Sequence, residues 1–201
     1  MEKYKDKYRI PTNRLQGYDY GSNGCYYVTI CTKNRNHYFG NIVNHEMQLS
    51  EAGAIAENIW LDIPNHFSFV ILDQYVIMPN HIHGILIFNK NDDDCRGDGR
   101  DAINRVFTVV VADCRDAINR VSTPKTGGIT GVHNPMLHAN LGRVMRWFKG
   151  RVSFECRSFV DFAWQERFYD RIIRDSNGLD NVRNYIFTNP QKWNDDEYYT
   201  V

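Results

Sequence analysis

Two histidines, and a tyrosine much later in the chain, are the residues of this sequence best suited to chemistry. His81 and His83 flank Ile82 within an apolar run. Side chains alternate between the two faces of a strand, so a strand here turns both imidazoles to one side and Ile82 to the core. Two neighbouring imidazoles are half of a metal site. Without a third ligand, the bare pair fits structural histidines better.

Tyr185 and Asn189 supply what the histidine pair lacks. Because they are four residues apart, they lie on the same face of a helix. The Asn189 amide offers a hard oxygen ligand that suits Mg²⁺ or Mn²⁺, and Tyr185 then lies one turn from anything the metal binds. Taken alone, Tyr185 would be a core residue, and Asn189 would simply end the helix before Pro190. The two pairs together predict a metal-assisted nucleophile.

The predicted chemistry is attack of the Tyr185 hydroxyl on a phosphodiester. A metal would polarise a phosphodiester oxygen and offset the charge that develops during attack. The ordinary pKa of tyrosine is about 10, so the phenol needs activation by a base or by the field of the metal. The resulting phosphotyrosine bond conserves the energy of the ester, so strand transfer needs no ATP. Tyr169 is the rival nucleophile, but the residue four positions later is Ile173, which cannot bind a metal.

The segments that carry these residues predict one α+β domain over residues 1–201. Runs of β-branched and aromatic residues predict strands, and helical spacing of apolar residues predicts helices. Strands are expected at 25–32, 67–78 and 81–88, and helices at 50–63, 137–154 and 179–189. The segment 165–174 fits either an edge strand or a short helical stretch. This order predicts an antiparallel sheet with helices packed on one face, and a ferredoxin-like split βαβ arrangement fits the count.

Turn and cap residues sharpen two of these boundaries. Pro79-Asn80 is a turn signal, so the strands on either side of it are expected to form a hairpin. Ser50 is expected to cap the first helix, and Pro64 to end it. The same helix is expected to bury one face, formed by Ile55, Ile59 and Ile63.

A repeat-containing insertion is predicted at residues 89–131, after the strand that carries the histidines. The seven-residue sequence RDAINRV occurs at 100–106 and again at 115–121. Two copies cannot build a solenoid, so we interpret the repeat as a short repetitive DNA element inserted in frame. The alternative is a hairpin of two similar strands. If the insertion is dispensable, a protein that lacks residues 96–128 still folds and keeps its chemistry.

Charge is balanced overall, with 24 basic and 24 acidic residues, which by itself disfavours nucleic-acid binding. Two mildly basic segments, 1–36 and 141–175, fit the walls of one groove as well as they fit solvated surfaces, while acidic residues gather at 92–94 and 195–197. The candidate phosphate contacts are Arg146, Lys149, Arg167, Arg171 and Arg174. Candidate platforms for stacking bases, or simply core residues, are Trp147, Trp164, Phe168 and Tyr169.

Several classes of protein are excluded by the sequence. No uninterrupted apolar stretch is long enough to span a membrane, and the charged N-terminal segment lacks the apolar region of a secretory signal. The five cysteines are scattered and include no CxxC pair, which argues against a zinc finger and a disulfide framework. A reducing cytoplasm is the expected compartment.

The sequence also resembles a known family. Four segments carry the likeness: CYYVTICTKNRNHYFG, LDQYVIMPNHIHGI, WQERFYDRIIRD and NYIFTNPQKW. They resemble the single-tyrosine HUH transposases (insertion sequence 200-like), and most of all the REP-associated tyrosine transposases. HUH denotes His, a hydrophobic residue and His, here residues 81–83. The likeness covers roughly residues 10–88 and 134–193, and its most specific segment is MPNHIHGI.

The resemblance implies a ferredoxin-like HUH endonuclease in which Tyr185 is the nucleophile. It implies that His81, His83 and Asn189 bind Mg²⁺ or Mn²⁺. Members cut and rejoin single-stranded DNA, usually at hairpin-bearing ends, through a 5′-phosphotyrosine. They are monomers or homodimers, and the implied setting is the nucleoid of a prokaryotic cytoplasm.

Two departures from the family keep other functions open. The insertion and the zero net charge fit a domesticated or inactive relative that binds DNA hairpins without cleavage. A further alternative is a metal-dependent hydrolase that uses water as its nucleophile and forms no protein–DNA adduct.

Overall fold

A computed structural model of the chain describes residues 3–4, 7–8, 15, 17–90 and 139–200. Its strands are β1 Lys3–Tyr4, β2 Lys7–Tyr8, β3 Gly24–Cys31, β4 Gly40–Val43, β5 Glu46–Leu49, β6 Val70–Met78, β7 His81–Phe88 and β8 Tyr169–Ile173. Its α-helices are α1 Glu51–Leu61, α2 Ile63–His66, α4 Leu141–Cys156 and α5 Ser176–Thr188. Two 3₁₀ helices are η1 Lys33–Arg35 and η2 Pro190–Asp195.

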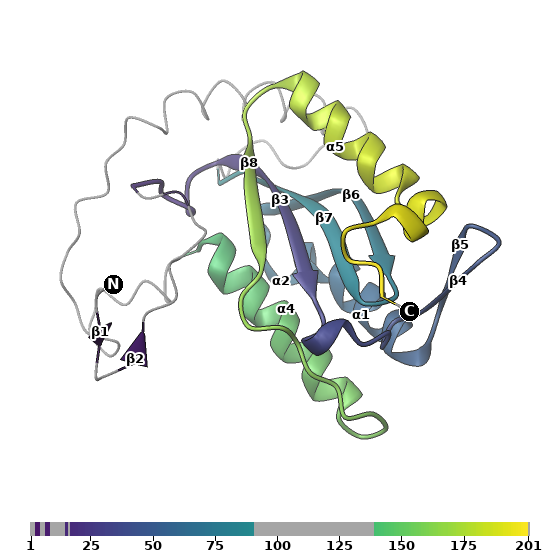
Figure 1. Ribbon diagram of the computed structural model, residues 1–201. Coiled ribbons are helices and arrows are strands. Elements are labelled where there is room, and N and C mark those ends of the chain that lie inside the picture. Colours follow the sequence, from purple (N-terminus) through teal and green to yellow (C-terminus); the bar gives the residue numbers. More distant parts are fainter. Residues whose placement is uncertain (1–2, 5–6, 9–14, 16, 91–138, 201) are drawn as a thin grey trace.

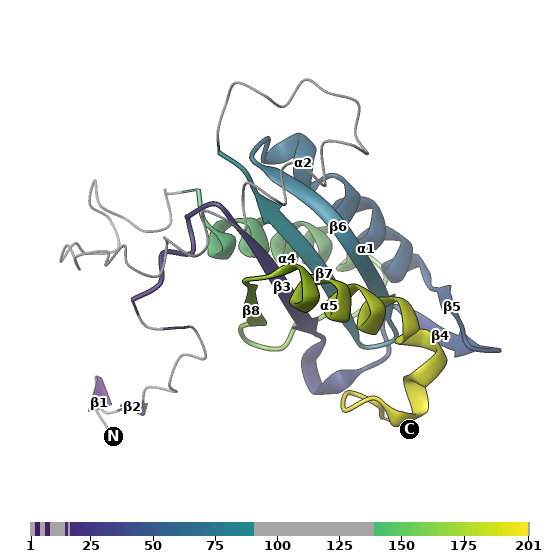
Figure 2. The same ribbon diagram turned by 90° about the horizontal axis from the view of Figure 1, so that it is seen from above.

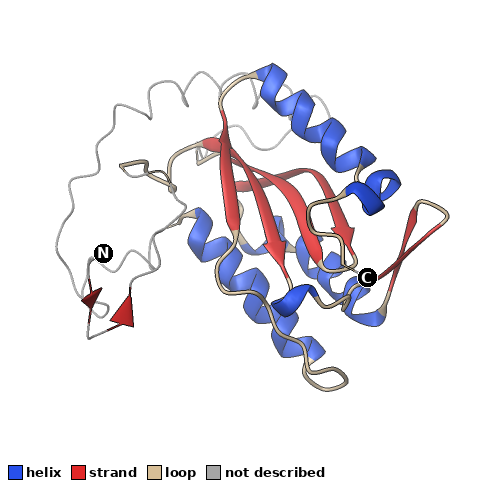
Figure 3. Cartoon of the chain, viewed as in Figure 1, coloured by secondary structure: helices blue, strands red, loops and turns tan. Residues whose placement is uncertain are grey.

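Four strands form one antiparallel sheet in the order β6-β7-β3-β8 (Figure 1). The hairpin β6–β7 turns through Pro79-Asn80, as predicted, and places Met78 opposite His81. On its other side β7 pairs with β3, so that Thr29 lies opposite His83. Strands β4 and β5 form a separate hairpin that projects beyond the sheet (Figure 3). The strand order and the helices between strands match the ferredoxin-like expectation.

The larger core lies between the sheet and helices α1, α2 and α4. Alternate residues of β3 and β7, among them Tyr26, Val28 and Ile82, enter this core and meet Trp60 and Phe148 from the helices. The Trp60 ring lies so close to Gly84 that a Cβ there would collide with it. Gly84 therefore allows the helix to approach the strand that carries both histidines.

Helix α5 covers the opposite face of the sheet (Figure 2). Its buried residues Leu179 and Ile186 pack against Ile85 and Ile87 of β7 and Cys25 of β3. The α+β class with an antiparallel sheet is confirmed, but the helices do not all lie on one face as expected. Because β7 carries apolar side chains on both faces and is buried at every position, both of its faces need a cover, and α5 supplies the second one.

Most other elements are where the sequence predicts them, with three refinements. The undecided segment 165–174 contains the edge strand β8. Ser50 caps α1 by accepting a hydrogen bond from Gly53 N, but α1 buries Ala52, Ala56 and Trp60, whereas Ile55 and Ile59 are only partly buried. Small residues let α1 lie close to the sheet, and this contact selects its buried face. Pro64 lies in the first turn of α2.

Most of the predicted insertion lies outside the described residues, and so do both copies of the repeat. The described residues that flank it lie close together. The Lys90 ammonium donates hydrogen bonds to the carbonyl oxygens of Gly21 and Ala139, the latter at 2.6 Å. The described residues on the two sides of this segment, Lys90 and Ala139, are therefore in contact, and the insertion itself stays a prediction.

Candidate active site

The two predicted histidines lie side by side at the start of β7. Their ring centroids are 4.5 Å apart, and both side chains are buried on the face covered by α5. Ile82 between them enters the core on the other face. This is the arrangement that strand alternation predicts for residues two apart.

A short hydrogen-bond chain sets the tautomer of His81. The Asn80 amide nitrogen donates to the carbonyl oxygen of Tyr198 at 2.8 Å, so its amide oxygen faces the other way. That oxygen lies 2.8 Å from His81 Nδ1, which must therefore carry the hydrogen and donate it. His81 Nε2 is left with a lone pair, and it has no hydrogen-bond partner among the described residues. An imidazole oriented through its other nitrogen is the usual form of a metal ligand.

His83 is oriented in a similar way by two hydroxyl groups of β3. Its Nδ1 lies 2.9 Å from Thr29 Oγ1 and 2.7 Å from the Tyr27 hydroxyl. Either oxygen can accept the Nδ1 hydrogen, which leaves Nε2 to face α5. The opposed register of β3 and β7 puts Thr29 and His83 on the same face, so the sheet itself creates this contact.

Both imidazoles are held neutral by their surroundings. Burial, and then the charge of Arg35, lower the pKa of His81 to about 3. Burial, followed by the neighbouring His81, lowers the pKa of His83 well below its ordinary value. Neutral imidazoles are the form that binds metals.

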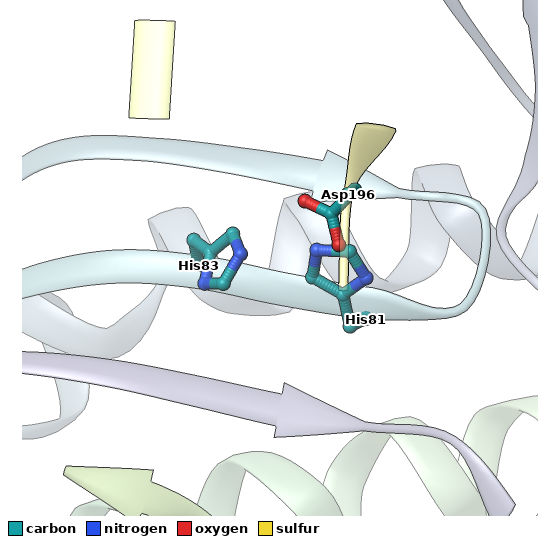
Figure 4. Close-up of side chains that lie close together, drawn as sticks. All are labelled: His81, His83 and Asp196. Atoms are coloured by element: carbon teal, nitrogen blue, oxygen red, sulfur yellow. The ribbon is translucent and has the colours of Figure 1, made fainter. Parts of the chain in front are cut away.

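Asp196, just after η2, is a third group at this site. Ligand atoms of His81, His83 and Asp196 all lie within 4.8 Å of one another, and Figure 4 shows the carboxylate above the His81 ring. The tail that carries Asp196 is fixed at several points. Arg35 donates to the carbonyl oxygen of Glu197 at 2.5 Å, and the Tyr198 ring packs on His81 with centroids 4.7 Å apart.

Tyr185 on α5 faces the same cluster. Its hydroxyl lies 3.4 Å from His83 Nε2 and 3.4 Å from Asp196 Oδ2. The side chain is 41% exposed and lines an open cavity of about 650 Å³. Burial, and then the charge of Asp196, raise the pKa of this phenol to about 12. A cation at the cluster would oppose that shift, since positive charge favours phenolate.

Asn189 caps the end of α5 and lies against the same carboxylate. Its side chain is buried, and the amide nitrogen donates to Asp196 Oδ2 at 2.8 Å. Its amide oxygen, like His81 Nε2, has no hydrogen-bond partner in the described part of the chain. Buried polar atoms without partners are rare, and a bound ion is one common explanation. Two neutral imidazoles, one carboxylate and one amide oxygen fit a divalent cation such as Mn²⁺ or Mg²⁺.

Comparison with known proteins gives a family and a fold. An uncharacterized protein of Haemophilus influenzae is 32% identical to the chain over 190 residues, which cover 92% of the chain and 91% of that protein. The chain belongs to this protein's family. No protein-family model matches the chain.

A solved structure shows which fold the chain has. The REP-associated tyrosine transposase bound to a REP hairpin superposes with a TM-score of 0.52 at 16% identity, over 90% of the chain and 74% of that protein. The chain therefore has the fold of this transposase, and the sequence resemblance is confirmed at that level. None of the described helices has the length and apolarity needed to cross a membrane.

The five predicted DNA contacts do not form one surface. Arg171 on β8 lines the cavity beside Tyr185, and Arg174, just beyond the strand, is exposed beside it. Arg146 and Lys149 line a different groove, between α4 and the segment that contains the exposed Arg167. The Lys149 ammonium donates to the carbonyl oxygens of residues 165 and 167, and burial lowers its pKa. Lys149 therefore has a structural role here, and any contact with DNA stays a prediction.

The candidate stacking residues, which include the rival nucleophile Tyr169, also lie at different places on the molecule. Tyr169 is exposed in the cavity that Tyr185 lines, whereas Trp164 and Phe168 border the groove along α4. Trp147 stacks on His66, with ring centroids 4.4 Å apart. Asp196 was not predicted, because a carboxylate in an acidic, irregular tail has no periodicity that would point it toward the histidines.

Proposed function

We propose that the chain is a metal-dependent DNA transposase that cuts and rejoins single-stranded DNA through a 5′-phosphotyrosine. The observation that carries this proposal is the position of the Tyr185 hydroxyl, 3.4 Å from His83 Nε2 and within reach of the His81–His83–Asp196 cluster. The fold shared with a REP-associated tyrosine transposase supports the same class of reaction. The substrate implied by that likeness is DNA with hairpin-bearing ends, in a prokaryotic cytoplasm.

In this proposal His81 and His83 hold a Mg²⁺ or Mn²⁺ ion, with oxygen ligands from Asn189 and Asp196. When bound, the ion polarises the scissile phosphodiester and stabilises the charge that develops on it. The Tyr185 oxygen would form a bond to phosphorus as the bond from phosphorus to the 3′ oxygen breaks, and the leaving 3′ oxygen would take a proton from solvent to give a 3′-hydroxyl on the other DNA piece. Asp196, 3.4 Å from the phenol, accepts its proton.

Arg171 is the predicted phosphate contact best placed for this reaction. It is exposed on β8 and borders the cavity that also contains Tyr185. Acidic residues Asp195 and Glu197 line the same cavity, so a cation and Arg171 must offset their repulsion of DNA. We therefore expect DNA binding near Tyr185 to be stronger with Mn²⁺ than with EDTA.

A denaturing gel tests the proposal directly. Purified protein is mixed with single-stranded DNA from the flanking region of its own gene, with Mn²⁺ or with EDTA. The expected result is a metal-dependent protein–DNA adduct that survives denaturation and is missing from Tyr185→Phe, which still binds the DNA. Hairpin binding without any adduct would favour the non-cleaving relative, and turnover without an adduct would favour a hydrolase that uses water.

A further inference from the structure

An ion pair holds α5 against the sheet close to Tyr185. The Arg183 guanidinium on α5 meets the Asp73 carboxylate on β6 in a fork. Its Nη2 lies 2.6 Å from Oδ2, and its Nε lies 3.1 Å from Oδ1. The two side chains are 31% and 10% exposed, so the pair is largely shielded from water. Two parallel contacts fix direction as well as distance, which a single point charge does not.

Asp73 faces α5 by the ordinary alternation of β6, at the point where the pairing of β6 becomes irregular. The register of β6 against β7 shifts between Leu72 and Tyr75. Ile71 and Val76 pack on the α5 face, whereas Leu72 and Tyr75 pack in the larger core. Asp73 joins the α5 face, and the bulge keeps Tyr75 on the other side. Asp73 is two residues after Ile71, so ordinary strand alternation turns it toward α5, and the irregularity that follows changes the face of Tyr75 instead.

The apolar contact of α5 is small, with Val182 partly buried beside the two buried residues of the helix. Only Leu179 and Ile186 of this helix are buried, and both lie on one narrow stripe. At about 100° per residue, Arg183 and Tyr185 flank that stripe on opposite sides. Side chains reach about 5–6 Å or more from a helix axis, so a rotation of about 10° would move the Tyr185 hydroxyl by roughly 1 Å. The fork between Arg183 and Asp73 is a directional contact on the side of the stripe away from Tyr185.

We propose that Arg183 and Asp73 form a positioning pair that fixes the rotation of α5 and so holds the Tyr185 hydroxyl over His83. The inference rests on the proposed function, since its consequence for rate is a consequence for the attack of Tyr185. Neither residue lies among the candidate metal ligands. Their loss should slow the covalent step and leave metal and DNA affinity almost unchanged. Misplacement of a reacting atom by about 1 Å can cost about 100-fold in rate.

The test compares Arg183→Gln and Asp73→Asn with a matched control, Arg151→Gln. Arg151 pairs with Glu155 at 2.8 Å on the exposed face of α4, so the control loses an arginine ion pair away from α5. The rate of adduct formation at saturating DNA should fall at least about tenfold in both test variants, while Mn²⁺ and DNA affinities stay within about twofold. Arg183→Lys keeps the charge but not the fork, so its rate should lie between those of wild type and Arg183→Gln.

Hydrogen exchange of the α5 amides gives a readout that needs neither DNA nor metal. Exchange should quicken in Arg183→Gln and Asp73→Asn but not in Arg151→Gln. The positioning role is overturned if Arg183→Gln forms the adduct at the wild-type rate, or if the control slows equally. If wild type forms no adduct, the proposed function fails instead. The exchange data then decide the positioning pair alone, and unchanged α5 exchange in Arg183→Gln overturns it.

Discussion

The two faces of the sheet bury different kinds of side chain. The face under α1, α2 and α4 is closed by large apolar groups such as Trp60 and Phe148. The face under α5 has a small apolar patch around Ile186, and beside it lie buried histidines and Asn189. Apolar burial stabilises the fold, whereas buried polar groups contribute little and are costly when unpaired. One face therefore supplies most of the apolar burial that stabilises the fold, and this allows the other face to hold reactive groups.

Removing a large side chain from the apolar face should have the greatest effect on stability. Trp60→Ala is expected to lower the free energy of unfolding by about 3–5 kcal/mol, because Trp60 is fully buried against Gly84 and Phe148. Tyr185→Phe on the other face is the matched contrast and should change it by less than about 0.5 kcal/mol. Urea denaturation measures both. If both variants lost the same free energy of unfolding, the two faces would not differ in their contribution to stability.

Removing one imidazole should have the next largest effect, on metal affinity. His83→Ala is expected to weaken Mn²⁺ binding by more than about 100-fold, because even groups that only orient a ligand are worth 10–100-fold. Calorimetric titration measures the affinity, and circular dichroism checks that the variant is folded. Tyr185→Phe should bind Mn²⁺ as wild type does. If His83→Ala bound Mn²⁺ with unaltered affinity, the metal site would not lie on this face of the sheet.

Acid should destabilise the metal-free protein through the same two histidines. Because the folded-state pKa values of His81 and His83 lie below the ordinary 6.5, their neutral forms contribute stability that is complete above about pH 6.5. That stability is lost as the pH falls from 6.5 toward the folded-state pKa. In EDTA, the free energy of unfolding should drop by about 1 kcal/mol per histidine between pH 7.5 and 5.5. A variant with both histidines changed to Gln should show a smaller drop; an equal drop would point to other groups.

Shortening the predicted insertion should have the smallest effect. A protein without residues 96–128 is expected to keep its free energy of unfolding within about 1 kcal/mol, since closure entropy changes slowly with loop length. The remaining residues can bridge the ends, because Lys90 already contacts Ala139. Urea denaturation and the adduct assay measure the outcome. An unfolded product would show that this segment belongs to the domain.

The sequence predicts the sheet well because its strands are long and distinctly apolar. The β6–β7 hairpin and the common direction of His81 and His83 follow from a turn signal and the period of a strand. The place of α5 does not follow, because β7 is apolar on both faces and so does not indicate which face a helix covers. The buried face of α1 was likewise set by close packing rather than by its isoleucines.

For the site, the sequence predicts pairs of residues that lie on the same strand or helix. It does not predict the residues whose places depend on contacts with the C-terminal segment after η2. The spacing of Tyr185 and Asn189 fixes their common helical face, and the structure brings both to the histidines. Asp196 and Asn80 gain their places from long-range contacts, such as the hydrogen bond from Asn80 to the Tyr198 carbonyl. Such contacts leave no local pattern in one sequence. The roles of all these residues remain predictions.

Identifying the residue that becomes joined to DNA would show whether Tyr185 is the nucleophile. After reaction with single-stranded DNA and Mn²⁺, the protein is digested, and the peptide that retains a nucleotide is sequenced by mass spectrometry. We expect the nucleotide to be joined to Tyr185 by a phosphodiester, within the peptide NYIFTNPQK. A nucleotide on Tyr169, or on any residue outside α5, would contradict this expectation.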